Sequence, residues 1–68
     1  MDVTAQDVCE IAGFRVTEFK IIWYGKVIDV FFNIRDKDGR IMSRNFDDQK
    51  EPENVLRRIE ESISNESF

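Results

Sequence analysis

The sequence contains no histidine, a single cysteine and no glycine-rich loop of the kind that cradles phosphates. Histidine is the most frequent general acid and base in enzymes, and covalent catalysis requires a nucleophile with a base beside it. The sequence offers neither arrangement, and it has no run of ligands with metal-binding spacing. These absences disfavour catalysis, so we expect a protein that is not an enzyme and that holds no cofactor or metal.

The lone cysteine, Cys9, excludes an internal disulfide and suits a reducing compartment. The sequence also lacks a signal peptide and any apolar run long enough to span a bilayer. We therefore expect a cytoplasmic location and no membrane partner.

The composition is that of a small folded protein with a well-solvated surface. Hydrophobic residues make up 41% of the 68 residues and charged residues 35%, which favours one globular domain over residues 1–68. The net charge of −4 disfavours general attraction to nucleic acid or to an anionic membrane.

Residues 27–46 predict a β-hairpin. Asp36 and Gly39 stand at the first and fourth positions of a type I turn that is followed by glycine in the left-handed region. In the bulged register that follows, almost all residues on one face of the hairpin are apolar. Its predicted pairs are Asp36 with Arg40, Ile34 with Met42, Phe32 with Arg44 and Val30 with Phe46.

A second hairpin is predicted between residues 14–24 and the strand that begins at Val27, with Gly25-Lys26 as a type II′ loop. It pairs Tyr24 with Val27 and Phe19 with Phe32. The two registers agree on one buried face, which comprises Phe19, Ile21, Trp23, Ile28, Val30, Phe32, Ile34, Met42 and Phe46. The apolar residues left on the open face are Ile22, Tyr24, Val27 and Phe31.

Helices are predicted at both ends of the chain. Within residues 3–13, Thr4 resembles an N-cap, Asp7 completes a short capping box, and Gly13 resembles a stop. Near the C-terminus, Pro52 suits a first helical position. Apolar residues follow it at helical spacing, namely Val55, Leu56, Ile59 and Ile63.

The expected fold class is α+β in the order α-β-β-β-α, a three-stranded antiparallel meander with two helices packed on one face. Double-stranded RNA-binding domains share this order, but they grip phosphates with a lysine-rich start to the last helix. This chain has Glu51-Pro52-Glu53 there. Direct nucleic-acid binding is therefore the less favoured function.

One stretch also resembles a known family. Gly39-Arg40 leads into Ser43-Arg44-Asn45-Phe46-Asp47-Asp48 and an acid-started helix. This passage is similar to the strand-to-helix passage of small phage anti-CRISPR proteins of the type I-F systems, over roughly a third of the chain. The resemblance implies a compact inhibitor that blocks a nucleic-acid-handling host complex by occupying a basic surface, and it assigns no binding residue.

The expected function is non-catalytic binding of another macromolecule, a host protein or a second copy of the chain. Aromatic residues ringed by polar ones resemble interface hot spots, and acidic residues steer association with a basic partner. The candidate partner-binding residues are Ile22, Tyr24, Asp29, Phe31, Asp47, Asp48, Glu51 and Glu53. The alternative is a homodimeric interaction domain that hides its apolar sheet face.

Overall fold

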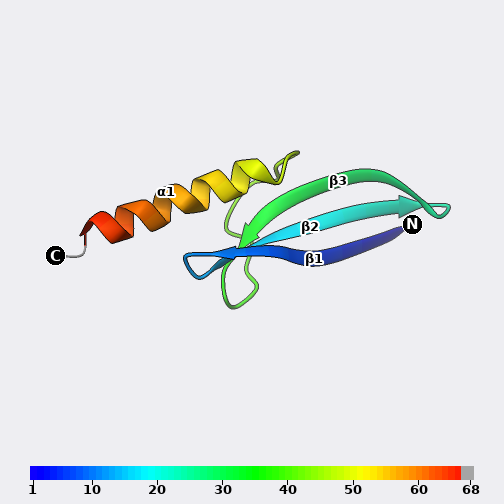
Figure 1. Ribbon diagram of the computed structural model, residues 1–68. Helices are drawn as coiled ribbons and strands as arrows, with labels where there is room; N and C mark the ends of the chain where they lie inside the picture. The colour runs from blue at the N-terminus through cyan, green and yellow to red at the C-terminus, as the bar shows by residue number, and fades with distance from the viewer. Residues whose placement is uncertain (67–68) are drawn as a thin grey trace.

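The computed structural model describes residues 1–66 as one antiparallel sheet and one helix. The strands β1 (Asp2–Ile11), β2 (Phe14–Trp23) and β3 (Lys26–Arg35) lie in the order β1-β2-β3. The helix α1 (Lys50–Glu66) follows a connecting segment. The molecule is elongated, 54 × 22 × 16 Å, with α1 at one end and the β2–β3 turn at the other (Figure 1).

The predicted N-terminal helix is wrong, because residues 2–11 form strand β1. β1 pairs with β2 through a two-residue turn in which Ala12 and Gly13 have φ of 55° and 83°. Positive φ at both positions defines a type I′ turn, which suits the twist of a hairpin. Gly13 therefore turns the chain between strands, where the sequence pattern had indicated the end of a helix. The α-β-β-β-α order fails with it, and so does the topological likeness to double-stranded RNA-binding domains.

The predicted register between β2 and β3 is wrong, by two residues next to the turn and by one residue beyond a bulge. Tyr24 and Gly25, both at positive φ, form the turn in place of Gly25-Lys26. Trp23 pairs with Lys26, and beyond a bulge Phe19 pairs with Phe31. Because side chains alternate between the faces of a strand, the one-residue shift beyond the bulge reverses which side chains of β2 and β3 share a face. Phe19, Ile21 and Trp23 therefore face away from Phe32.

The predicted third strand of the meander is also wrong, although its turn is confirmed. Asp36 N–H donates to the Arg40 carbonyl at 3.0 Å, and Gly39 has φ of 84°. The chain beyond forms isolated bridges only, Arg35 with Ile41 and Phe32 with Phe46. Phe46 therefore pairs two residues away from its predicted partner, Val30. Extra residues bulge out between the bridges, where Ser43 Oγ accepts the Ile34 N–H at 2.9 Å.

The C-terminal helix is confirmed, but it begins at Lys50, before Pro52. Asp48 caps it: the Lys50 N–H donates to Asp48 Oδ1 at 2.9 Å. A side-chain oxygen in this place satisfies one of the amides that a helix start leaves without a partner. The amides of the first helical turn have no partner within the helix. Proline has no backbone N–H, so Pro52 is tolerated in this turn, where it is buried.

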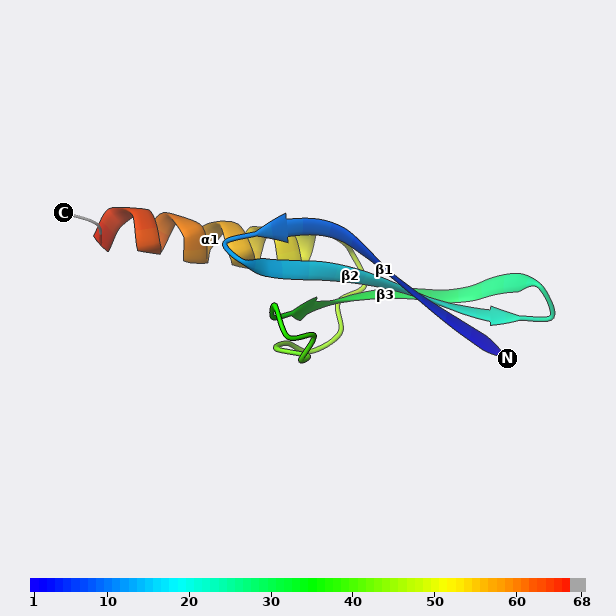
Figure 2. The ribbon, with the colours of Figure 1, turned by 90° about the horizontal axis from the view of Figure 1, so that it is seen from below.

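The hydrophobic core lies between α1 and the end of the sheet nearest to it. It consists of Val16, Phe32, Ile34, Phe46 and Leu56. Phe32 was correctly predicted to be buried, whereas Trp23 is 47% exposed. The sheet thus has a near half, residues 7–17 and 32–35, that α1 covers, and an arm, residues 1–6 and 18–31, that extends beyond it (Figures 1 and 2).

Candidate functional site

The near half carries a shallow hollow of about 430 Å³ on the edge strand β1. A bulge between Asp7 and Cys9 shapes it, and its walls include Glu10 and Arg15. Asp7 is held in place, since it accepts a hydrogen bond from Thr17 Oγ1 at 2.9 Å and lies 3.6 Å from Arg15. The charges of Asp7 and Arg15 at this hollow therefore satisfy each other.

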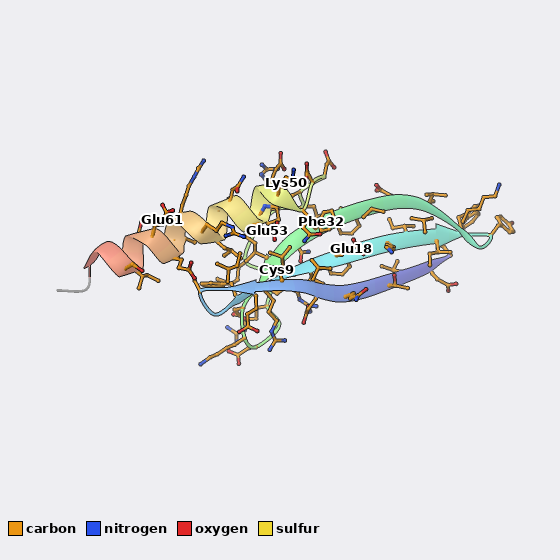
Figure 3. The ribbon with its side chains drawn as sticks, viewed as in Figure 1. Cys9, Glu18, Phe32, Lys50, Glu53 and Glu61 are labelled. Atoms are coloured by element: carbon orange, nitrogen blue, oxygen red, sulfur yellow. The ribbon has the colours of Figure 1, made fainter. Side chains whose placement is uncertain are left out.

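Cys9 lies beside this hollow, close to Glu53 at the start of α1 (Figure 3). Burial raises the pKa of the Cys9 thiol, and the hydrogen bond and negative charge of Glu53 raise it further. A reactive cysteine needs the opposite environment, one that stabilises the thiolate. Cys9 therefore acts as a small packing residue. Among the side chains that the structure describes, no group of three or more potential metal ligands is close enough together to hold an ion.

On the face opposite α1, the near half buries polar side chains. Thr17 and Asn33 pair across β2 and β3 and are almost completely buried. Asn33 Nδ2 donates to Asn45 Oδ1 at 3.4 Å, while Asn33 Oδ1 has no hydrogen-bond partner among the described residues. This contact fastens the 36–46 loop beneath the sheet (Figure 1). The polar groups here hold the loop in place.

The arm has an apolar surface on this same face, which we call the arm patch. Phe19 and Phe31 pair across β2 and β3 and stack with ring centroids 5.1 Å apart. Val3 pairs with Ile21 and lies on the same side. The arm patch consists of Val3, Ala5, Phe19, Ile21, Trp23 and Phe31. Neither α1 nor the 36–46 loop packs over it in the described part of the chain.

The β2–β3 turn extends this surface to the tip of the arm. Tyr24 is 89% exposed, and its ring meets that of Trp23 edge to face at 5.0 Å. Aromatic residues of this kind give up little conformational entropy on binding and are enriched in interfaces. The arm therefore presents aromatic rings on its face and at its tip.

The predicted partner-binding residues fall into two separate groups. The first lies on the arm, where Tyr24 is at the tip and Asp29 pairs with Ile21 beside the arm patch. Phe31 belongs to the arm patch, but Ile22 points to the other face, because it alternates with Ile21 and Trp23 along β2. The expected apolar cluster of Ile22, Tyr24, Val27 and Phe31 on one face is therefore wrong.

The second group, the predicted acidic residues, lies at the start of α1, at the other end of the molecule. Asp47 and Glu51 are exposed, whereas Asp48 caps the helix and Glu53 lies against Cys9. The structure does not bring these residues together with those of the arm. Any effect they have on binding at the arm is long-range steering.

Sequence reasoning missed Phe19, Ile21 and Trp23 as surface residues because it assigned them to the core. One signal was present: with these three buried, Phe14 and Val16 fall on the wrong face of the same strand. The structure resolves this conflict without a bulge at Thr17 and Glu18, since the apolar side of β2 changes along its length. Val16 is buried near α1, and Phe19 lies on the opposite face of the arm.

No protein-family model matches this chain, and neither the curated proteins nor the solved structures contain a significant match to it. The stretch that resembles phage anti-CRISPR proteins forms a loop with two isolated bridges. The phage-inhibitor role has no support from these comparisons. Among the described residues, no helix is long and apolar enough to cross a membrane.

Proposed function

We propose that this protein works by binding another protein through the arm patch, without catalysing a reaction. The observation that carries the proposal is a row of aromatic and aliphatic side chains on a sheet face that lacks a second layer. A sheet normally buries its apolar face against another element. Contiguous exposed apolar surface on a soluble protein usually marks an interaction site.

The chemistry of the arm patch indicates its partner. The stacked rings of Phe19 and Phe31 form the centre of this apolar surface, and Trp23 continues it toward the tip. Asp29 lies at its border, so the complementary surface is an apolar one with a basic group at its rim. The net charge of −4 and the exposed acids near α1 favour association with such a basic partner, most strongly at low salt.

The test compares variants on the two faces of one strand. Partner proteins are captured from a lysate on the immobilised wild-type chain and identified by mass spectrometry, and their affinities for variants are then measured. Trp23→Ala and Phe31→Ala are expected to weaken binding at least about tenfold, as interface hot spots do.

Ile22→Ala is the matched control, because Ile22 lies between Ile21 and Trp23 and points away from the arm patch. It is expected to bind within about twofold of the wild type. Circular dichroism establishes that all three variants are folded. Equal loss from Ile22→Ala and Trp23→Ala would argue against a site confined to the arm patch, and unchanged binding by folded Trp23→Ala and Phe31→Ala variants would refute the proposal.

A further inference from the structure

The two edges of the sheet differ in what their outward-facing backbone groups bind. On the β3 edge, alternate amides donate to acceptors within the molecule. They are the N–H groups of Val30, Phe32 and Ile34, with Asp29 Oδ1 at 2.9 Å, the Phe46 carbonyl at 2.8 Å and Ser43 Oγ at 2.9 Å as the acceptors. The chain therefore closes this edge with its own groups.

The other edge is strand β1, and β2 alone pairs with it in the described part of the chain (Figure 1). Antiparallel strands bond to a given neighbour through alternate residues. Phe32 bonds outward to Phe46, so its partner on β2, Glu18, bonds to β1 through Gln6. The alternation directs the backbone groups of three other β1 residues away from the sheet, namely Val3, Ala5 and Asp7. These outward groups have no hydrogen-bond partner among the described residues.

This open edge lies on the arm. The bulge between Asp7 and Cys9 interrupts the edge in the near half, which is one way in which proteins prevent strands from joining. Residues 1–7 are all exposed and contain neither proline nor lysine, the residues that commonly protect an edge. A strand edge without such protection is a template for pairing with another strand.

The open edge is complementary to itself. When two copies pair antiparallel about a twofold axis at Thr4, Val3 lies opposite Ala5 and Asp2 lies opposite Gln6 of the second copy. Thr4 lies opposite Thr4, a cross-strand pair that is favourable in sheets. Val3 and Ala5 both direct their backbone groups outward, so they meet as hydrogen-bonded pairs. No acidic residue faces another in this register.

Other registers fit less well. An axis at Ala5 sets Asp7 opposite Val3 and brings Asp2 to the bulge, whereas an axis at Val3 shortens the paired stretch to residues 1–5. A parallel pairing in register sets each acid beside its own copy, which is unfavourable. The axis at Thr4 uses the whole stretch before the bulge.

We propose that two copies of this chain pair their β1 strands antiparallel about Thr4, so that the two sheets join into one. Such an isologous contact is the most common arrangement in soluble oligomers. Val3 and Ala5 of both copies meet on the arm-patch side, so the two arm patches form one continuous surface. The inference does not rest on the proposed function. Because the contact between two strand edges is small, the dimer is expected to dissociate in the micromolar range.

The first test is sedimentation equilibrium of the purified full chain from about 1 to 500 µM, a range chosen to span micromolar dissociation. We expect the mass of a dimer at the upper end. Ala5→Pro removes an amide that points away from β2, a position where an edge strand tolerates proline. This variant is expected to remain monomeric throughout, and circular dichroism verifies that it keeps its sheet.

Two lysine substitutions on one face of β1 test the register. Thr4→Lys sets two positive charges opposite each other and is expected to weaken the dimer by about fivefold to tenfold. Gln6→Lys sets each new lysine opposite Asp2 of the other copy and is expected to strengthen the dimer about threefold or more. A register centred on Ala5 would set residues 4 and 6 opposite each other, so the two variants would then behave alike.

The matched control is Val27→Lys. Val27 is exposed on the same face of the arm but lies on β3, away from the β1 edge. The change alters the net charge as the β1 variants do, and it is expected to leave the dissociation constant within about twofold of the wild type.

Three outcomes would overturn the inference. The first is a wild-type chain that remains monomeric up to the highest concentration, and the second is a folded Ala5→Pro variant that dimerises as the wild type does. The third is a dimer that Thr4→Lys leaves intact and Trp23→Asp abolishes, because that dimer would pack its arm patches face to face. The proposed function fails separately, since Trp23→Ala and Phe31→Ala are expected to weaken partner binding and leave dimerisation unchanged.

Discussion

The near half of the sheet and the arm are built from the same three strands, yet the two halves differ in what covers them. In the near half, Leu56 of α1 packs on one face, and Asn45 fastens a loop to Asn33 on the other. The arm has strand pairing and contacts among its own side chains, such as the stack of Phe19 on Phe31, but no second layer covers the arm patch in the described part of the chain. Pairing satisfies backbone hydrogen bonds, but a second layer is needed to remove apolar side chains from water.

The comparison explains why the protein is long for its size. A compact chain of 68 residues has a radius of gyration of about 11 Å, and this one has 13.9 Å. Its stability is concentrated where α1 meets the sheet. The arm and the later turns of α1 extend beyond this contact.

Phe31 and Phe32 provide the sharpest test of this difference, because they are adjacent residues of one type on opposite faces. Phe32 is 7% exposed in the core, and Phe32→Ala is expected to cost about 3–5 kcal/mol through lost burial and a cavity. Phe31→Ala loses the stack on Phe19 and is expected to cost about 1–2 kcal/mol. Urea unfolding measures both. Equal costs would mean that the arm is as tightly packed as the near half.

Substitutions at Gly39 test the loop that covers the near half on the face opposite α1. Its φ of 84° suits glycine, and the space for a Cβ is adequate, with Arg35 Nη2 at 3.7 Å. Backbone conformation is therefore the cause of any effect, and Gly39→Val is expected to cost about 1–3 kcal/mol. Gly39→Asn should cost clearly less, since asparagine tolerates this region better. Identical unfolding midpoints for the two variants would argue against the turn.

Asp48 tests the attachment of α1 at its first turn. Asp48→Ala removes the acceptor for the Lys50 amide and is expected to cost about 1 kcal/mol. The control is Asp47→Ala at the exposed neighbouring residue, expected to fall within about 0.5 kcal/mol of the wild type. Thermal unfolding followed by circular dichroism distinguishes them. A cap that contributes nothing would leave the two variants equally stable.

The smallest expected effect is a pH dependence of the free energy of unfolding that comes from Cys9. It reports on the contact between β1 and α1. Because burial raises the pKa of the Cys9 thiol, the folded protein keeps the thiol proton to a higher pH than the unfolded chain does. The stabilisation that comes from keeping this thiol protonated is complete below the thiol pKa of the unfolded chain, about 8.5. It is lost as the pH rises through the higher thiol pKa of the folded protein. We therefore expect stability to decrease at alkaline pH, and Cys9→Ser to reduce that decrease.

Glu53→Gln separates the two causes of the Cys9 shift. It removes the carboxylate that opposes thiolate formation and leaves Cys9 in place. Alkylation with iodoacetamide across the alkaline range should then begin at a lower pH than in the wild type. An unchanged profile would leave burial as the sole cause.

Several local features were predictable because their signals are local. The spacing of Leu56, Ile59 and Ile63 indicated α1, and the Asp36 and Gly39 pair indicated the turn that the structure contains. The exposure of Tyr24 was also predicted. In each case a few neighbouring residues carry the physical cause, either helical periodicity or a required positive φ.

The site was only partly predictable, for a reason that lies in strand register. Phe31 was assigned to the open face correctly, but Trp23 was assigned to the core. The turn lies at Tyr24-Gly25, one residue before its predicted place. This step moves the pairing by two residues, and the bulge at Ile28 takes one back. The remaining shift of one residue reverses which side chains of β2 and β3 share a face beyond the bulge.

The sequence by itself determined the C-terminal helix, strands β2 and β3, and the turn at Gly39, since each follows from the preferences of adjacent residues. Only the tertiary structure decided that residues 2–11 are a strand, because Thr4 and Gly13 suit a helix or a hairpin equally well by local preference. Pairing with β2 favours the hairpin by satisfying the backbone groups of both strands. Tertiary packing also decided which apolar residues stay exposed, since α1 packs on the near half of the sheet and leaves the arm uncovered.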